Sequence, residues 1–430
     1  MTTTEQAASG VETPDRHGLS MLQGAALTIG GVLGTGVITL PSLAARAAGP
    51  ASLISWLVLV VLSVPLAATF GALGARFPDA GGVATYVRRA FGAKVGGMVG
   101  WCFYLAVPIG APAASMMAGH YVAAAFGGGR VTVLGVSLAL ILGVGAMNAR
   151  GVRLSGRAQL VFSAILAATI LVTVAVAAPH ARPSAIGPFA PHGWTGVVSA
   201  AGLLVWAFAG WEAVAPVAAE YRSPRRDVPL ATGVAVVVVG VLYLALATTT
   251  VLVLGPAAAT SSAPLSDLMS LAVGDGARVA TAAVAVLLSV GAMNAYFAGS
   301  AKLGSALGRD GALPRWLAAG SGIGEVPRRS LAVVTGLACV TLGITALTGV
   351  DLDVWLLLAT SAFGIVYVLG TAAAVRLLPA GWARRGAVVA VVASVALALS
   401  IGLPMLWSVV VCAVALAYQT VGARHPGTKK

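Results

Sequence analysis

The sequence has little charge and very little acid. Only 9% of its 430 residues are charged, and its 13 Asp and Glu are half as many as its 26 Lys and Arg. Hydrophobic residues make up 59%, and the charges lie between long apolar runs rather than within them. Because a soluble domain carries roughly a quarter charged residues, this composition predicts a polytopic membrane protein.

Cysteine and histidine are too scarce and too scattered for a disulfide framework or a metal centre. Cys102, Cys339 and Cys412 each lie in an apolar segment, where a thiol acts as a small packing side chain. The five histidines lie apart from one another, and no Walker A sequence occurs. We therefore expect no metal, no cofactor and no ATP hydrolysis by this chain.

Apolar segments of about 17 to 25 residues predict twelve transmembrane helices and no soluble domain. The predicted spans are 21–47, 50–75, 95–124, 130–148, 157–178, 195–220, 228–254, 278–304, 330–349, 353–377, 385–401 and 404–421. Gly402-Leu403-Pro404 is expected to form a tight turn between the last two. The expected fold is therefore all-α and polytopic.

The basic residues predict how these spans are oriented. With the N-terminus in the cytoplasm, all but four of the 26 Lys and Arg fall on the cytoplasmic side, where such residues gather; the exceptions are Arg46, Arg130, Arg182 and Arg278. Residues 1–18 and 422–430 are then short cytoplasmic tails. Anionic lipid of the inner (plasma) membrane accounts for the net charge of +13, so we expect no nucleic-acid partner.

The stretch "GGVLGTGVITLP" (Gly30–Pro41) places helix-disfavouring residues inside the first span. One interpretation is close helix packing, because Gly30 and Gly34 form a GxxxG pair. The other is a broken helix, unwound around Gly31 to Gly36, since free backbone at membrane depth is tolerated where it lines a cavity. The N–H groups of Gly34, Thr35 and Gly36 would then suit a carboxylate.

A second interruption is expected five spans later, at "LLVWAFAGWE" (Leu203–Glu212). Transporters of this kind contain two inverted repeats, so broken helices occur at corresponding places. Carbonyls of Trp206, Ala207 and Ala209 would suit an ammonium group, and two facing breaks make a site for a zwitterion. The predicted repeats are 19–180 (helices 1–5) and 181–380 (helices 6–10), with peripheral helices 11 and 12 in 381–421.

Four further stretches fall in predicted cytoplasmic loops. They are "RFPDAGGVATYVRRAFG" (Arg76–Gly92), "NARGVRLSGRAQ" (Asn148–Gln159), "EYRSPRRDVPLA" (Glu220–Ala231) and "GRDGALPRW" (Gly308–Trp316). With the two glycine-containing stretches, they make the chain resemble the amino acid–polyamine–organocation permeases from about Gly18 to Arg329. This resemblance implies a leucine-transporter-type fold with a 5+5 inverted repeat and broken helices 1 and 6.

Within that family, "AVPIGAPAASM" (Ala106–Met116) and "GVLGTGVITLPSLA" are similar to the bacterial exporters of methionine and branched-chain amino acids. Many uptake permeases of the family carry a glutamate before the "RFP" stretch, whereas Gly71–Ala75 holds none here. The resemblance therefore favours export over generic uptake.

The resemblance also implies which residues bind the substrate. Carbonyls of Val32, Trp206 and Ala209 would meet its amine, and amides of Gly34, Thr35 and Gly36 its carboxylate. Trp206 would close over it as a gate, the alternative being a packing aromatic. The substrate side chain would meet Ile109, Ala113, Ala207, Met293 and Asn294. Because none of these is charged and Met293 is flexible, we expect methionine, leucine, isoleucine and valine as substrates.

Glu212 is the only acid predicted near the middle of the membrane. An ionisable group there is a functional candidate, and we interpret it as a proton-coupling site; the alternative is a structural carboxyl group that ties the break to neighbouring backbone. The fifth span has no interior lysine, and no sodium site is evident. H⁺ is a candidate coupling ion, and the identity of the ion stays open.

Together these features predict a secondary active transporter of neutral apolar amino acids that works by alternating access. Spans 1, 2, 6 and 7 would rock against spans 3–5 and 8–10. The alternatives are an uptake permease or exchanger with another substrate and, in other classes, a transporter-derived sensor or an intramembrane enzyme. The sequence shows neither an output domain nor a nucleophile paired with a base.

The orientation can be tested with single cysteines in a cysteine-free variant. Ser223→Cys should resist an impermeant thiol reagent in intact cells, and Ser262→Cys should react, because the basic residues place these loops on opposite sides. Labelling of Ser223→Cys without permeabilisation would contradict the predicted topology.

Overall fold

The computed structural model describes residues 19–77, 82–151, 156–213, 218, 221–320 and 325–424. In these residues every regular element is a helix, apart from one isolated bridge between Leu19 and Tyr221. Nine helical stretches among them are long and apolar enough to cross a membrane. The chain is therefore an all-helical, multi-span membrane protein.

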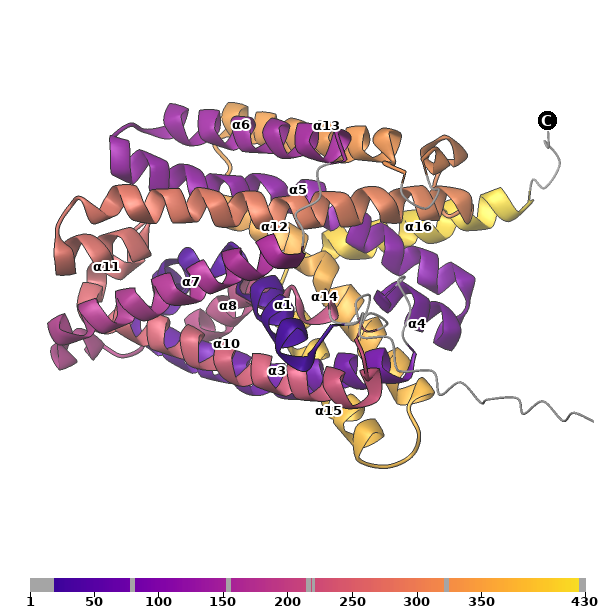
Figure 1. Ribbon diagram of the computed structural model, residues 1–430, viewed down its shortest axis with the longest axis horizontal. Coiled ribbons are helices and arrows are strands. Elements are labelled where there is room, and N and C mark those ends of the chain that lie inside the picture. Colours follow the sequence, from indigo (N-terminus) through magenta and orange to yellow (C-terminus); the bar gives the residue numbers. More distant parts are fainter. Residues whose placement is uncertain are drawn as a thin grey trace, which may run out of the picture.

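The long helices lie roughly along one axis of the molecule (Figure 1). They are α3 (Ser52–Arg76), α5 (Ala93–Phe126), α6 (Arg130–Ala149), α7 (Gly156–Ala177), α10 (Pro224–Leu254), α12 (Ala277–Arg309), α13 (Arg328–Thr348), α14 (Leu352–Leu377), α15 (Trp382–Ile401) and α16 (Met405–Arg424). Short helices lie at opposite ends of this bundle: α4 (Gly82–Phe91) at one and α11 (Pro264–Val273) at the other.

Helices α4 and α11 occupy stretches where the sequence predicted only loops. In α4 the side chains of Val83, Tyr86 and Val87 are buried while Arg88 and Arg89 are exposed. This spacing of three to four residues is that of an amphipathic helix. It was missed because a ten-residue helix is too short to register as a span.

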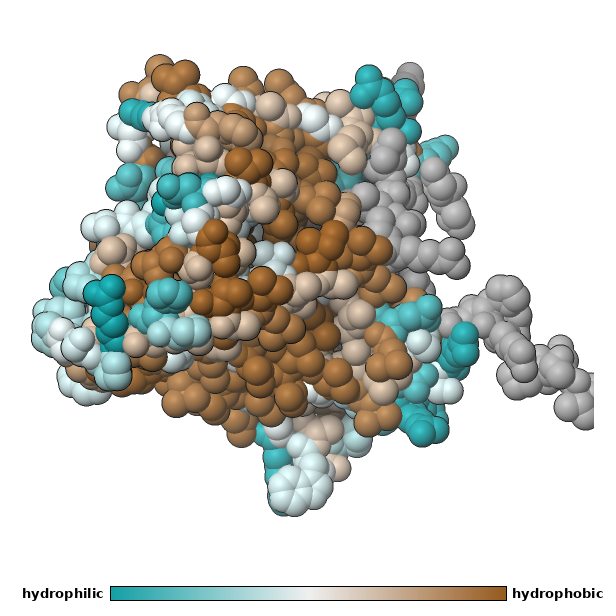
Figure 2. Space-filling view, turned by 60° about the vertical axis from the view of Figure 1, so that its left-hand side comes forward, coloured by the Kyte–Doolittle hydropathy of each residue, from teal (hydrophilic) through white to brown (hydrophobic). Residues whose placement is uncertain are grey.

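Apolar side chains cover the middle of the molecular surface. Figure 2 shows a broad brown band between hydrophilic ends. Val61, Val237 and Val392 belong to this exposed apolar surface, each more than half exposed. Such a surface is a liability in water but suits the hydrocarbon core of a bilayer.

The first apolar segment consists of two helices rather than one. Helix α1 (Met21–Leu33) ends at Gly34, whose φ of 20° and ψ of −164° depart from helical geometry. A short 3₁₀ turn, η1 (Gly36–Ile38), follows, and α2 (Leu40–Ala48) then begins. The chain is thus unwound between two helical halves.

A second interruption follows α8 (Gly193–Leu204). The 3₁₀ turn η5 (Val205–Phe208) leads to Ala209 with ψ of 121° and Gly210 with φ of 127°, and η6 (Trp211–Ala213) comes next. Gly210, a residue type that disfavours continuous helix, therefore lies in this interruption. Most of the remainder of the predicted span, up to residue 220, lies outside the described residues.

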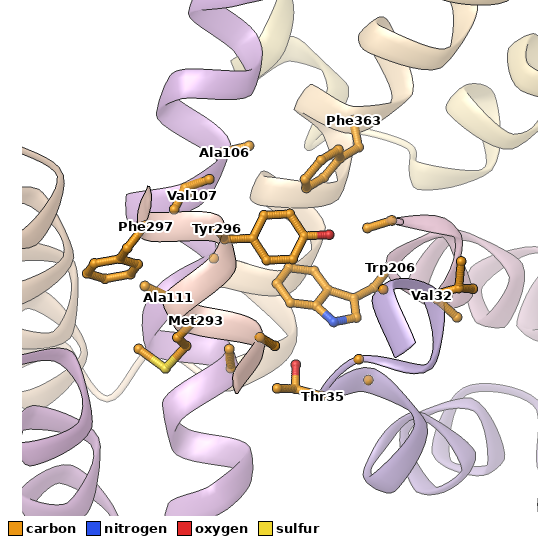
Figure 3. A pocket seen from close by; sticks show the side chains of 18 residues that line it. Val32, Thr35, Ala106, Val107, Ala111, Trp206, Met293, Tyr296, Phe297 and Phe363 are labelled. Atoms are coloured by element: carbon orange, nitrogen blue, oxygen red, sulfur yellow. The ribbon is translucent and has the colours of Figure 1, made fainter. Parts of the chain in front are cut away.

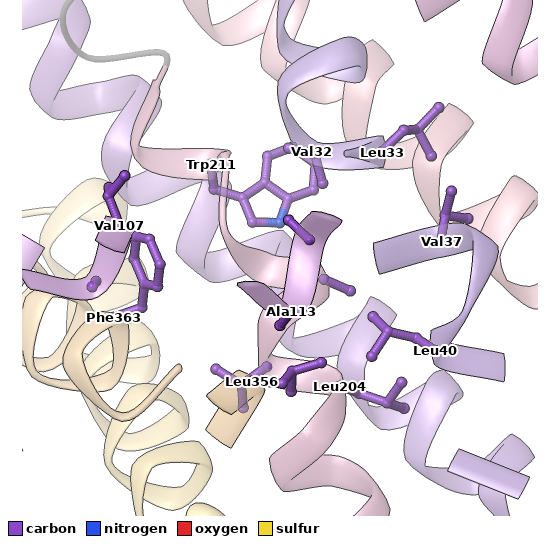
Figure 4. Close-up of a cluster of buried hydrophobic side chains, with 14 of the residues drawn as sticks. Val32, Leu33, Val37, Leu40, Val107, Ala113, Leu204, Trp211, Leu356 and Phe363 are labelled. Atoms are coloured by element: carbon purple, nitrogen blue, oxygen red, sulfur yellow. The ribbon is translucent and has the colours of Figure 1, made fainter. Parts of the chain in front are cut away.

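The two interruptions are embedded in one hydrophobic core. Leu33 and Leu40 flank the first, and Leu204 precedes the second; all three side chains are fully buried. Figure 4 shows Val32 beside the indole of Trp211, so the core links the two unwound stretches. Apolar packing can hold irregular backbone in place away from lipid.

Candidate functional site

The last turn of α1 and the second interruption touch through their backbones. A Cβ atom on Gly210 would lie 2.6 Å from the carbonyl oxygen of Gly31 and 2.8 Å from the Cα of Val32. Gly210 also has a φ of 127°, a conformation that other residues rarely adopt. Only glycine therefore allows the second interruption to approach the end of α1 this closely.

A cavity of about 60 Å³ opens beside this contact. Its wall draws on both interruptions and on three long helices, α5, α12 and α14 (Figure 3). The lining residues are Gly31, Val32, Gly34, Thr35, Gly36, Ala106, Val107, Gly110, Ala111, Ala114, Trp206, Ala207, Ala209, Ala292, Met293, Tyr296, Phe297 and Phe363.

None of the described residues that line this wall has a charged side chain. Its polar side-chain groups are the hydroxyl groups of Thr35 and Tyr296 and the indole N–H of Trp206, and the interrupted helices add backbone groups. A mostly apolar cavity with a few polar groups is typical of small-molecule sites. This site suits a ligand with polar ends and an uncharged, apolar body.

Eight of the residues predicted to bind substrate line the cavity: Val32, Gly34, Thr35, Gly36, Trp206, Ala207, Ala209 and Met293. Their contact with a substrate stays a prediction. Ile109, Ala113 and Asn294 are not among the described residues that line the cavity, and their role in binding substrate also stays a prediction. Helix α5 turns Gly110, Ala111 and Ala114 inward instead, because successive helical residues point about 100° apart. The side-chain oxygen of Asn294 accepts a hydrogen bond from Nδ2 of Asn148 at 2.8 Å.

The aromatic side of the cavity was not predicted. Tyr296 and Phe297 follow Met293 by three and four residues, so the helical period offered a signal for both. Phe363 comes from α14, and its ring packs edge-on against Tyr296 with centroids 6.4 Å apart. No local pattern marks Phe363, because its contact depends on long-range packing.

Tyr243 of α10 joins the two interruptions. Its hydroxyl group donates to the carbonyl oxygen of Val32 at 2.8 Å and lies 3.3 Å from that of Ala207. A hydroxyl group has one proton, so the two carbonyls share it, and each keeps further lone-pair capacity. An ammonium group bound by Val32 would therefore share that carbonyl with Tyr243.

Glu212 lies next to the second interruption but does not line the cavity. Its side chain is 5% exposed, and Oε2 accepts hydrogen bonds from the backbone N–H of Gly210 at 2.9 Å and from the hydroxyl group of Tyr367 at 2.7 Å. The carboxyl group therefore connects the break to α14. This geometry is compatible with both interpretations of Glu212.

Residues 19–428 match the model of a family described as "Amino acid permease". An uncharacterized amino acid permease of Bacillus subtilis, YecA, is 32% identical over 382 residues, 87% of this chain and 89% of that protein. The L-methionine/branched-chain amino acid exporter YjeH of Escherichia coli is 31% identical over 402 residues, 92% of this chain and 94% of that protein. Human cationic amino acid transporter 4 is 30% identical over 262 residues, 56% of this chain and 41% of that protein.

Gly36→Val tests whether the glycine of the first break serves the cavity. An added Cβ would lie 2.6 Å from Cδ1 of Trp206 and 2.9 Å from Cδ1 of Leu40, so the larger side chain must enter the cavity or displace the indole. We expect amino acid flux in proteoliposomes to be lost while the protein still reaches the membrane. Gly135→Val is the matched control, because an added Cβ there meets nothing within 4 Å. Normal flux in Gly36→Val would show that this glycine serves packing alone.

Proposed function

The chain belongs to the amino acid permease family, and from this premise we propose that it exports methionine, leucine, isoleucine and valine across the inner membrane. The uncharged cavity between the two helix interruptions carries the proposal. The extensive similarity to an exporter of methionine and branched-chain amino acids supports it. As a permease, the chain is a transporter rather than an enzyme.

The wall of the cavity favours neutral apolar side chains. A cationic or anionic side chain would lose its hydration there without meeting an opposite charge, at a cost of several kcal/mol. Met293, Phe297 and Val107 offer apolar contact to the substrate's side chain. The flexible thioether side chain of Met293 can adapt to substrate side chains of different shape. The polar ends of the substrate would meet backbone groups at Gly34–Gly36 and at Val32, Trp206 and Ala209.

The proposed architecture has twelve spans. In it, α1 and α2 form span 1, α8 begins span 6, and α15 and α16 are peripheral spans 11 and 12. Residues 19–180 and 181–380 are the inverted repeats. Both termini are cytoplasmic, as the distribution of Lys and Arg favours. The bundle of spans 1, 2, 6 and 7 then rocks against the others and exposes the cavity to each side in turn.

Glu212 is the proposed proton site of this cycle. Its hydrogen bonds reach Gly210 in the break and Tyr367 in α14, so a change in its protonation acts on the contact between two moving parts. A buried carboxyl group of this kind is costly in a membrane and is a functional candidate for that reason. Substrate binding and proton binding then occupy neighbouring but separate places.

The substrate class can be tested by counterflow of labelled amino acids in proteoliposomes. We expect methionine, leucine, isoleucine and valine to exchange, and lysine and glutamate not to. Met293→Trp should shift the preference from methionine towards valine, because the indole fills part of the cavity. Leu142→Trp, on an exposed part of α6, is the control for size. Exchange of lysine or glutamate alone would overturn the assignment, and an unchanged preference in Met293→Trp would remove Met293 from the selectivity wall.

Glu212→Gln tests proton coupling. It keeps the side chain's size but cannot ionise, so accumulation driven by a pH gradient should fall about tenfold while exchange at equal pH continues. The exposed Glu325→Gln is the matched control and should behave as the wild type. If the pH dependence of flux is the same in Glu212→Gln as in the wild type, Glu212 is a structural carboxyl group.

A further inference from the structure

The indole of Trp206 is fitted between two glycines from different helices. An added Cβ on Gly36 would lie 2.6 Å from Cδ1 and 3.1 Å from Nε1, on the five-membered ring. An added Cβ on Gly110 would lie 2.9 Å from Cη2 and 3.1 Å from Cζ3, on the six-membered ring. Protein interiors are close-packed and side chains essentially never come this near, so both contacts depend on the absence of a Cβ atom.

This arrangement makes the indole a bridge across the cavity. Figure 3 shows it in the middle of the site, with Tyr296 on one side and Thr35 on the other. One of its ends rests on the interruption of the first span and the other on α5, a continuous helix of 34 residues. The ring therefore spans the space that a substrate would have to cross.

The contacts of the Trp206 indole with Gly36 and with Gly110 join different parts of the molecule. Gly36 and Trp206 both lie in the interruptions, and Gly210 of the second packs against the backbone of Gly31, in the turn of α1 that leads into the first. Gly110 lies outside them, in the part of the molecule against which the proposed bundle rocks. In the proposed cycle the contact with Gly36 would persist, whereas the contact with Gly110 would be made and broken.

We propose that Gly110 is the seat onto which the Trp206 gate closes. This inference rests on the proposed function, and it makes Gly110 a positioning residue that acts through the indole rather than through the substrate. A methyl group at position 110 would also lie 3.1 Å from Cβ of Ala359, which is fully buried on α14. Because Ala359 is held in a packed helix and cannot move away easily, the indole of Trp206 would have to shift away from position 110.

Gly110→Ala is the test, with Gly143→Ala on α6 as the matched control because an added Cβ there meets nothing within 4 Å. Counterflow should fall about tenfold in Gly110→Ala and stay unchanged in Gly143→Ala. Trp206→Phe removes the ring atoms that approach Gly110. In the Trp206→Phe background, Gly110→Ala should lower the counterflow rate less than about twofold. Such non-additive effects show that two residues act on each other.

A second readout does not depend on transport. A single cysteine replacing Ala292, which lines the cavity on α12, is labelled by a water-soluble thiol reagent in a variant lacking Cys102, Cys339 and Cys412. Gly110→Ala should raise the labelling rate at least about threefold with Trp206 present and leave it unchanged with Trp206→Phe.

The two readouts separate the seat from the proposed function. Equal labelling rates with Gly110 and Gly110→Ala, or the same increase in both the Trp206 and Trp206→Phe backgrounds, would overturn the seat. Coupled labelling in a protein that moves no apolar amino acid would support the seat and overturn the proposed function.

Discussion

The backbone contact between Gly31 and Gly210 is the constraint on which the rest of the site depends. Each interruption leaves peptide groups without helical partners at a depth where lipid cannot replace them. Packing the two interruptions together, with Tyr243 donating to Val32 and lying near Ala207, shields these groups within the protein. A cavity lined by backbone from both can then exist in the middle of a membrane protein.

Glycine contributes to this site through the side chain it lacks. Gly210 admits the backbone of the first interruption, Gly36 admits one edge of Trp206, and Gly110 admits the other. Glycine loses more conformational entropy on folding than other residues and therefore disfavours regular structure. At each of these three positions, however, a Cβ atom would collide with a neighbouring residue. A position that disfavours regular structure is here a position where two elements must come close.

The sequence predicts those features of the fold and the site that depend on neighbouring residues in the chain, and fails for those that depend on long-range packing. Glycines between apolar residues indicated both interruptions, and eight predicted residues line the cavity. On α5 the cavity is lined by Gly110, Ala111 and Ala114 rather than by Ile109 and Ala113, because a helix that is apolar on all sides gives no periodic signal for its inner face. The hydrogen bond between Asn294 and Asn148 joins two helices and has no local sequence signal, and Phe363 was missed because only folding brings α14 to the cavity.

Keeping charge out of the cavity has a consequence for coupling. Had Glu212 lined the wall, its carboxylate would have attracted the ammonium group of any amino acid and competed with the backbone carbonyls. It instead accepts hydrogen bonds from Gly210 and Tyr367 and is not among the residues that line the cavity. In the proposed cycle, a proton bound there would change the hydrogen bonds between α14 and the second interruption, and its effect on the substrate would pass through Gly210 and its neighbour Ala209. In the proposed function the uncharged cavity and the buried acid would therefore act together: the wall would favour apolar side chains while an ionisable group remains within one hydrogen bond of Gly210.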